Sequence, residues 1–165
     1  MRKTTCIECG GNATVSRRNY QFDQMGIPVE LRNIEVISCP NCGETPVIPN
    51  MNDLMDGLAF AVLCNPCTLT GAEVAFLRKY VNKSAREFAR YLKINHTSLS
   101  KIENQQRKLR SGLDMQVRLT VFAMDEKLRQ RLNELVEMIP DIKDRCANDN
   151  EQILIDPATG NYEYA

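Results

Sequence analysis

The pattern of apolar and polar residues changes near residue 50 of the chain. Before that point turn-forming and β-branched residues dominate, and the segments 13–23 and 28–38 predict two β-strands joined by the sequence QMGI. The run NDLMDGLAFAVLC that follows predicts a helix, with Asn52 as its N-cap and Asn65-Pro66 as its end. We therefore expect a small β structure first and helices after it.

Three short helices are predicted after Thr70. The segments Thr70-Gly-Ala-Glu73 and Ser84-Ala-Arg-Glu87 are capping boxes that mark helix starts, and Asn95 is a third candidate cap. Apolar residues recur at helical spacing within each helix: Val74, Leu77 and Val81, then Ala85, Phe88, Ala89 and Leu92, and finally Leu99 and Ile102. Because only the residues KIN separate the second and third helices, these must cross sharply, as in a helix-turn-helix.

The last third of the chain carries one more apolar stripe. It consists of Leu128, Leu132, Leu135 and Ile139, preceded by Met115, Leu119, Phe122 and Met124. This stripe either covers the preceding helices as internal core or forms the seam of a dimer. Pro140 ends the helical region, since an interior proline loses a backbone hydrogen bond. The acidic tail at 141–165 has two strand-like runs around DPATG, compatible with a hairpin, and either stays solvated or contacts a basic partner.

Composition indicates a water-soluble globular protein of one ordinary domain or two small ones. The 165 residues are 43% hydrophobic and 25% charged. No apolar run approaches the roughly 18 residues that a membrane span needs, and the first residues lack the apolar core of a secretory signal. We therefore expect a cytoplasmic protein, in which the seven cysteines are metal ligands or buried apolar residues and not disulfides.

Charge is segregated although the formal net charge is zero. Residues 1–69 carry 5 lysines and arginines against 7 carboxylates, residues 70–111 carry 10 against 3, and residues 112–165 carry 6 against 11. A basic block between two acidic segments indicates that the middle of the chain meets a polyanion. A solvated helical surface is the plainer interpretation, but the basic block coincides with the three predicted helices.

Two cysteine pairs predict a metal site. Cys6, Cys9, Cys39 and Cys42 form a C-x2-C-x29-C-x2-C array in which glycine follows each pair. Such knuckles aim two thiolates at one metal, and four thiolates close the tetrahedral shell of a structural Zn²⁺ without leaving a position for water. The predicted hairpin fits the 29-residue spacer, and a β module this small benefits from a metal. We expect one structural zinc ion.

The third pair, Cys64-Asn-Pro-Cys67, allows three interpretations. It lies at the end of a predicted apolar helix, so the spacing can be a coincidence within a linker at 65–69, with Cys64 buried. It can instead be a redox-sensitive pair, although the βαβ context of a thioredoxin-like motif is missing. A second metal site would need further ligands, and only His96 and Cys146 remain.

The third short helix carries candidate base-reading residues. His96, Thr97, Ser98 and Lys101 lie toward the N-terminal end of this helix, the part of a recognition helix that meets base edges in the major groove. Lysines and arginines at the ends of elements and in the following loop suit phosphate contacts: Lys83, Arg86, Arg107, Lys108 and Arg110. His96 can equally be a solvated cap residue, and the cations a generic basic surface.

With both parts established, the chain resembles the YgiT-type zinc finger/helix-turn-helix proteins, which include the MqsA-type antitoxins of bacterial toxin–antitoxin modules. The matching segments are CIECG, CPNCG and LTGAEVAFLRKYVNKSAREFARYLKINHTSLSKIEN, and the resemblance covers residues 4–111. It implies a zinc domain followed by an XRE/Cro-like helix-turn-helix domain that dimerises on palindromic operator DNA, often with autoregulation. It also implies, less directly, a cognate toxin partner.

The chain departs from this family pattern at several positions. Lys93 and Gln105 stand where glycine is usual, and we expect Asn104 to adopt the left-handed conformation in place of Gln105. The base-reading asparagine and arginine of the MqsA-type helix fall on Thr97 and Lys101, so the operator sequence should differ. The extension beyond Pro140 lies outside the resemblance.

These observations predict an α+β protein in four segments. Residues 1–64 form a zinc-binding β domain with one helix, 65–69 a linker, 70–140 a helix-turn-helix and dimerisation domain, and 141–165 an acidic tail. The expected function is a DNA-binding repressor that acts as an antitoxin. The alternatives are a stand-alone zinc regulator that senses metal or redox state, and a protein-interaction adaptor. An enzyme is not expected, because His96 is the only histidine and no phosphate-binding glycine loop is present.

Overall fold

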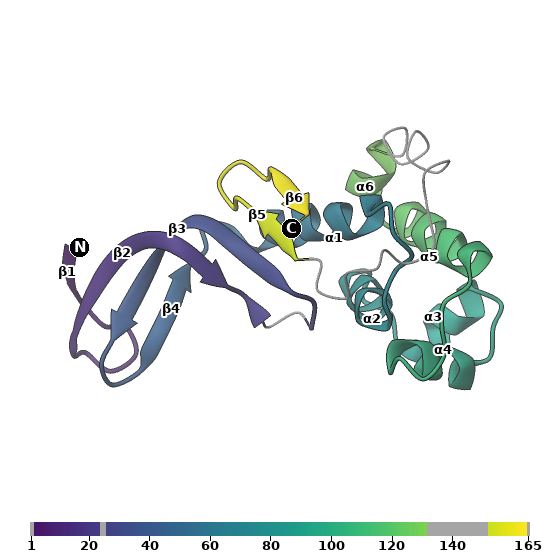
Figure 1. The fold of residues 1–165 in the computed structure, drawn as a ribbon, viewed down its shortest axis with the longest axis horizontal. Coiled ribbons are helices and arrows are strands. Elements are labelled where there is room, and N and C mark those ends of the chain that lie inside the picture. The colour runs from purple at the N-terminus through teal and green to yellow at the C-terminus, as the bar shows by residue number, and fades with distance from the viewer. Residues whose placement is uncertain (1, 24–25, 132–151, 165) are drawn as a thin grey trace. The chain divides into compact units, whose positions relative to one another are not determined.

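The computed structural model describes residues 2–23, 26–131 and 152–164, and its fold class is α+β (Figure 1). Four strands come first: β1 (Arg2–Thr5), β2 (Asn12–Gln21), β3 (Val29–Cys39) and β4 (Gly43–Val47). Six helices follow: α1 (Met51–Cys64), α2 (Gly71–Tyr80), α3 (Ala85–Tyr91), α4 (His96–Glu103), α5 (Ser111–Met124) and α6 (Glu126–Gln130). Strands β5 (Ile153–Ile155) and β6 (Tyr162–Tyr164) end the described chain.

The chain groups into two compact units, with the boundary inside α1. The first comprises residues 1–23, 28–57 and 151–165, and the second comprises 24–27 and 58–150. The C-terminal hairpin therefore belongs with the N-terminal sheet. No helix within the described ranges combines the length and the apolar character that crossing a membrane requires.

Strand β3 is the central strand of the sheet in the first unit. It pairs antiparallel with β2 along one edge, and β2 pairs with β1. Two strands share its other edge: β4 lies antiparallel to the C-terminal part, up to Cys39, and β5 lies parallel to 29–31. The predicted strand pair is thus confirmed, and the first and last segments of the chain form one sheet.

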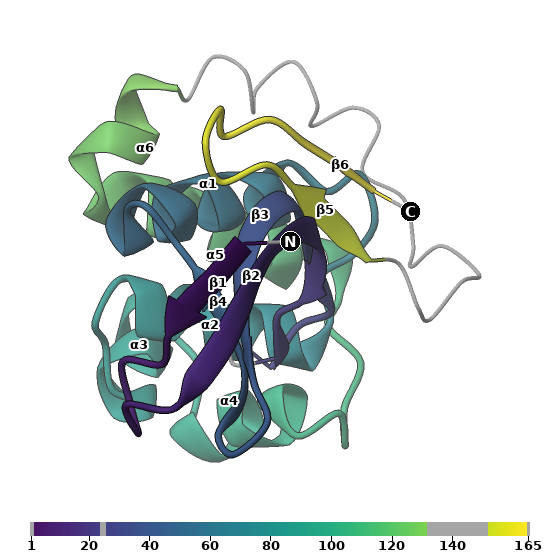
Figure 2. The same ribbon diagram turned by 90° about the vertical axis from the view of Figure 1, so that its left-hand side faces the viewer.

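The C-terminal hairpin buries its apolar strand against the first turns of α1. β5 and β6 pair antiparallel, and Ile153, Leu154 and Ile155 are all buried. A Cβ atom on Gly57 of α1 would lie 3.1 Å from Cδ1 of Ile155, so helix and hairpin are in close contact, as Figure 2 shows. Because β5 is covered on both faces, it is apolar throughout.

The predicted helix starts are confirmed at Thr70, Ser84 and Asn95. Thr70 and Ser84 form complete capping boxes with Glu73 and Glu87, and the Asn95 side chain accepts a hydrogen bond from the N–H of Thr97. The cap predicted for α1 was wrong by two residues. The side chain of Asn50, not Asn52, accepts hydrogen bonds from the first N–H groups, because the helix already begins at Met51.

Lys93 and Gln105, which stand where the resembled family usually has glycine, both adopt the left-handed conformation. Lys93, between α3 and α4, has φ of 51°, and Gln105, after α4, has φ of 58°. The expectation that Asn104 would take over the left-handed conformation was wrong, because its φ is −88°. Backbone hydrogen bonds fix both turns: the N–H of Ile94 donates to the carbonyl of Ala89, and that of Gln106 to the carbonyl of Lys101.

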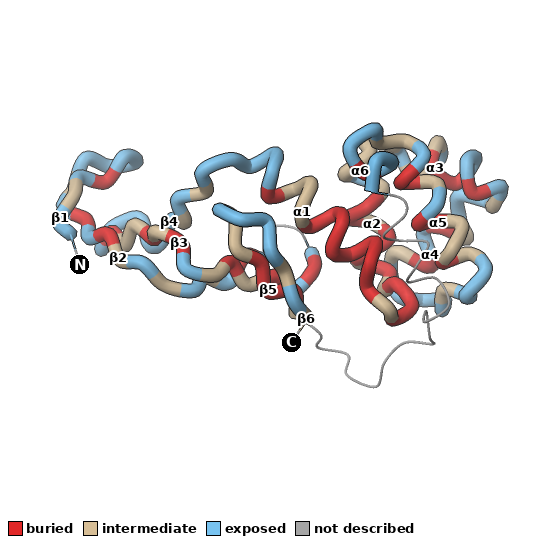
Figure 3. Tube along the Cα trace, turned by 90° about the horizontal axis from the view of Figure 1, so that it is seen from above, coloured by how far each residue is buried: buried red, intermediate tan, exposed pale blue. Residues whose placement is uncertain are grey.

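A buried ion pair holds the segment between α1 and α2. The guanidinium of Arg118 on α5 is fully buried and donates to Asp114 at 2.8 Å and to the carbonyl oxygens of Asn65 and Cys67. Asp114 also accepts the N–H of Leu69 at 2.8 Å. Figure 3 shows that burial runs from the second half of α1 into this segment. Residues 65–69 are therefore held in place by α5 within the second unit.

A second ion pair joins α2 to α4. Arg78 donates through Nε and Nη2 to both carboxylate oxygens of Glu103, at 2.7 and 3.1 Å, and through Nη1 to the carbonyl of Lys83. At the other end of α2, Gly71 lies directly on the backbone of α4. A Cβ atom there would lie 2.1 Å from the carbonyl oxygen of Ile102. Both contacts fix α4, the helix with the candidate base-reading residues.

We predict that Gly71→Ala destabilises the helical unit by about 3 kcal/mol, because backbone carbonyls cannot move aside as a flexible side chain would. Urea unfolding monitored by circular dichroism measures the change. Gly112→Ala is the matched control: a Cβ atom at Gly112 on α5 meets nothing within 4 Å. This control should be neutral or stabilising by up to about 1 kcal/mol. Equal effects of the two substitutions would contradict the close contact between α2 and α4.

We predict that Asp114→Asn costs about 3–5 kcal/mol of unfolding free energy, because it leaves the buried Arg118 charge uncompensated while keeping the side-chain shape. The control is Arg129→Gln, which removes the exposed pair between Arg129 and Glu126. That pair should contribute no more than about 0.5 kcal/mol. Denaturant unfolding of both variants under the same conditions gives the comparison, and a loss below 1 kcal/mol for Asp114→Asn would show that the pair is not needed.

Candidate metal centre and candidate nucleic-acid interface

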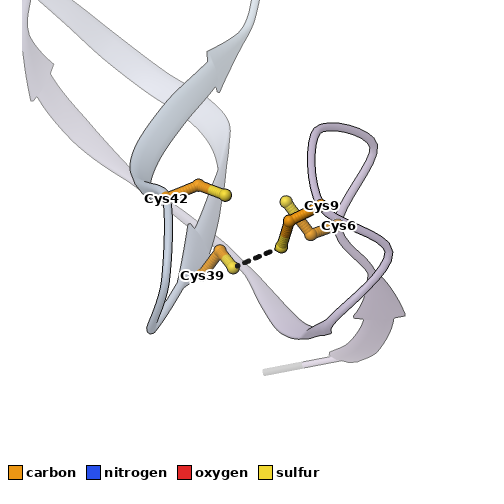
Figure 4. Close-up of side chains that lie close together, drawn as sticks. All are labelled: Cys6, Cys9, Cys39 and Cys42. Atoms are coloured by element: carbon orange, nitrogen blue, oxygen red, sulfur yellow. Dashed lines mark hydrogen bonds between the residues drawn. The ribbon is translucent and has the colours of Figure 1, made fainter.

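The four predicted cysteine ligands converge at one end of the first unit. Cys6 and Cys9 come from the turn after β1, whereas Cys39 ends β3 and Cys42 lies in the turn before β4 (Figure 4). All four Sγ atoms lie within 4.8 Å of one another, and those of Cys9 and Cys39 are 3.7 Å apart. Four sulfurs at about 2.3 Å from one Zn²⁺ lie nearly 4 Å apart in a tetrahedron. The cluster fits a metal ion such as zinc.

Local backbone conformation shapes the two knuckles. Each second cysteine is followed by a glycine in the left-handed region: Gly10 has φ of 71° and Gly43 has φ of 86°. In the first knuckle the N–H of Gly10 donates to the carbonyl of Cys6, and the N–H of Cys6 donates to the carbonyl of Gly11. These glycines permit the tight turns that bring both thiols of a pair to the same side.

The cluster is half buried and has little apolar support. Cys6 and Cys39 are buried together with Ala13, with Ile37 packed against them, whereas Cys9 and Cys42 are exposed. Hydrogen bonding to Cys9 is the largest of several contributions, among them burial and the other two thiols, that raise the pKa of Cys42 to about 12. Four thiolates in contact repel one another, so a cation is needed to hold them deprotonated together.

The third cysteine pair is not part of this cluster. Cys64 ends α1 and is buried, as the linker interpretation expected. Cys64 is not part of a disulfide, whereas Cys67 is disulfide-bonded, which the expectation of reduced thiols did not foresee. Cys64 and Cys67 therefore do not pair with each other. The backbone between them is fixed by Asn65, whose side chain accepts the N–H of Cys67.

The candidate DNA-contacting residues all belong to the helical unit. His96, Thr97 and Lys101 are exposed on α4, and Ser98 is half-buried beside them. Arg86 is exposed on α3, and Lys83 is half-buried just before that helix. Arg107, Lys108 and Arg110 are exposed in the loop between α4 and α5. Sequence reasoning left out three exposed cations of the same block: Lys79 on α2, Arg90 at the end of α3 and Lys93 in the turn.

Every carboxylate of the basic block already has a partner. Glu73 and Glu87 complete capping boxes, and Glu103 binds Arg78. The hydrogen bonds from Ser84, more than the nearby charges of Lys83 and Arg90, lower the pKa of Glu87. Within the described residues, Arg78 is the one cation of this block that forms an ion pair. The charge of the others is left for solvent or for a bound anion.

The apolar stripe of the last third is only partly described. Phe122 and Leu128 are buried, and Phe122 packs edge-on against Phe60 of α1. Leu119 is 43% exposed on α5. Leu132, Leu135, Ile139 and Pro140 lie outside the described residues. Internal core and dimer seam therefore both remain open for this stripe.

Comparison of the chain with protein-family models, with curated proteins and with solved structures finds no match.

We predict that one zinc ion binds per chain and that Cys42→Ser abolishes binding, whereas Cys64→Ala leaves one ion per chain. Chelation should disorder the knuckles and the sheet end around them, because the few buried residues there cannot replace metal–thiolate bonds. Elemental analysis gives the stoichiometry, and amide NMR spectra before and after chelation locate the change. Unchanged signals for residues 2–15 after metal removal, or two zinc ions per chain, would contradict this assignment.

Proposed function

We propose that this chain is a zinc-stabilised, dimeric repressor that binds a palindromic operator and belongs to the YgiT-type family, as the antitoxin of a toxin–antitoxin module. The main support for DNA binding is the excess of positive charge in the basic block, residues 70–111. Ten lysines and arginines face three carboxylates there, and all three carboxylates are engaged in caps or in the pair with Arg78. Phosphates release bound counterions on meeting such a surface, which drives association.

In this proposal α3 and α4 form the helix-turn-helix. Their short connection is fixed from two sides: Lys93 adopts the left-handed conformation, and Gln116 on α5 donates to the carbonyl of Leu92 at 3.1 Å. Leu99 and Ile102 are buried on the inner side of α4. The exposed side then carries Thr97 and Lys101, suited to base edges, while flanking cations suit phosphates. The rigid turn would hold α4 at a constant angle in the major groove.

The metal site has a structural role in this proposal. Four cysteine ligands fill the coordination shell of zinc and leave no position for a substrate. The exposure of Cys9 and Cys42 gives specific support to a second candidate, a stand-alone regulator in which oxidation of these thiols or metal loss changes the state of the first unit. The identity of the neighbouring gene distinguishes the two, because an antitoxin copurifies with the small basic toxin encoded beside it.

We predict salt-dependent binding of the chain to a duplex from its own promoter, with an unrelated duplex of equal length as reference. Lys101→Ala should weaken promoter binding by about 1–3 kcal/mol and change binding to the reference much less, because it removes a base contact. Arg107→Ala should weaken both equally and lower the salt slope by about one, because it removes a phosphate contact. Fluorescence anisotropy at several salt concentrations measures both effects.

Two results would refute the proposal. If Lys101→Ala weakens binding to the promoter and to the reference duplex equally, α4 is not the base-reading helix. Salt-independent or undetectable binding to both duplexes would favour the adaptor interpretation, in which these helices are only a scaffold.

A further inference from the structure

The helical unit contains a cavity of about 230 Å³ between the start of α4, the loop that follows α4 and the start of α5. Three apolar side chains line it: Ile102 is buried, and Ile94 and Leu113 are half-buried. Asn95 and Ser98 of α4 add polar atoms beside them. A concave apolar site with a few polar groups is the usual form of a small-ligand pocket, and this one is somewhat smaller than the usual range of about 300–1,000 Å³.

Three cations also line this cavity. Arg107, Lys108 and Arg110 all contribute to its lining and are exposed. None of them forms an ion pair or a side-chain hydrogen bond with any residue in the part of the chain that the structure describes. Three like charges around one cavity repel one another, and a bound anion would relieve that repulsion.

The loop that carries these cations has a fixed conformation. The N–H groups of Gln106 and Arg107 both donate to the carbonyl of Lys101, at 2.8 and 3.1 Å. Gln105 turns the chain with a positive φ, and the N–H of Asp114 donates to the carbonyl of Arg110 at the start of α5. Since the loop is tied at both ends, a ligand would not have to order it, which favours affinity.

We propose that this cavity binds a small organic anion, with one acidic group at the three cations and an apolar body of about one ring against the isoleucine and leucine side chains. A bare phosphate would use the cations but leave the apolar lining unfilled. Binding of this anion would also compete with DNA, because we assign the same three cations to phosphate contacts. The competition rests on the proposed function, whereas the anion site does not.

The first test uses 4-(trifluoromethyl)benzoate as the probe and the full chain with its metal. Fluorine NMR titration gives the affinity, and amide shifts locate the site. We expect saturable shifts centred on Ile94, Ser98, Lys108 and Leu113. Inorganic phosphate and the uncharged 4-(trifluoromethyl)benzyl alcohol should each bind at least about tenfold more weakly, because each lacks one half of the recognition.

Two double variants distinguish binding in the cavity from unspecific binding to the basic surface. Arg107→Gln with Arg110→Gln should weaken benzoate binding about tenfold. Lys79→Gln with Arg90→Gln removes the same charge from α2 and α3, outside the cavity, and should change binding less than about twofold at 0.15 M salt. Equal losses in the two variants, equal binding of the neutral alcohol, or shifts spread over the whole basic surface would overturn the site.

The competition is measured separately with a labelled promoter duplex. Saturating benzoate should raise the apparent Kd for DNA several-fold, and the alcohol at equal concentration should not. If NMR establishes the site but the Kd for DNA is unchanged, the competition is refuted while the anion site stands. If no promoter binding occurs at all, the proposed function fails, and the NMR result still decides the anion site.

Discussion

The helical unit depends on one buried charge pair, Arg118 with Asp114 on α5. A buried guanidinium is tolerated only when its charge is compensated and its N–H groups are bonded, and here the partners come from outside α5 as well as from within it. The carbonyls of Asn65 and Cys67 and the N–H of Leu69 all belong to the segment between α1 and α2. Residues 65–69, which the sequence predicts to be a linker, are thereby fixed to α5. Because α2 starts directly after it, the same pair sets where Gly71 meets the backbone of α4.

The carboxylates and cations of the basic block have separate tasks. Glu73, Glu87 and Glu103 act within the fold, at two helix starts and at the joint between α2 and α4. The cations other than Arg78 contribute no ion pair to the described structure and are therefore available at the surface. A block that is merely solvated would be expected to pair some of these charges, since opposite charges at helical spacing stabilise a helix slightly. The local arrangement is compatible with the DNA-binding role that we propose for the positive surface.

Sequence reasoning succeeded where the signal is local and failed where it is not. The capping boxes at Thr70 and Ser84 and the glycine-bounded cysteine pairs are defined by neighbours within a few residues, and the structure confirms them. The parallel pairing of β5 with 29–31 joins segments more than 120 residues apart, and no spacing in the sequence records it. The burial of Arg118 was not predicted, because arginine is rarely fully buried in a protein. Lys93 and Gln105 show that left-handed positions are also missed when the residue there is not glycine, because the surrounding hydrogen bonds, not the residue type, impose the conformation.

The two ends of β3 are stabilised by different chemistry, and this decides how the first unit responds to change. Its C-terminal end at Cys39 has few buried neighbours and relies on the four sulfurs that could share a metal ion. Its N-terminal end lies between β2 and the buried strand β5, which packs on α1 through Ile155 and Gly57. Apolar burial at that end does not depend on metal, so we expect metal loss to disorder the sheet at Cys39 and to leave the end at Val29 ordered. We therefore expect the C-terminal hairpin to hold the N-terminal end of β3 in place if a metal ion is removed from the four cysteines.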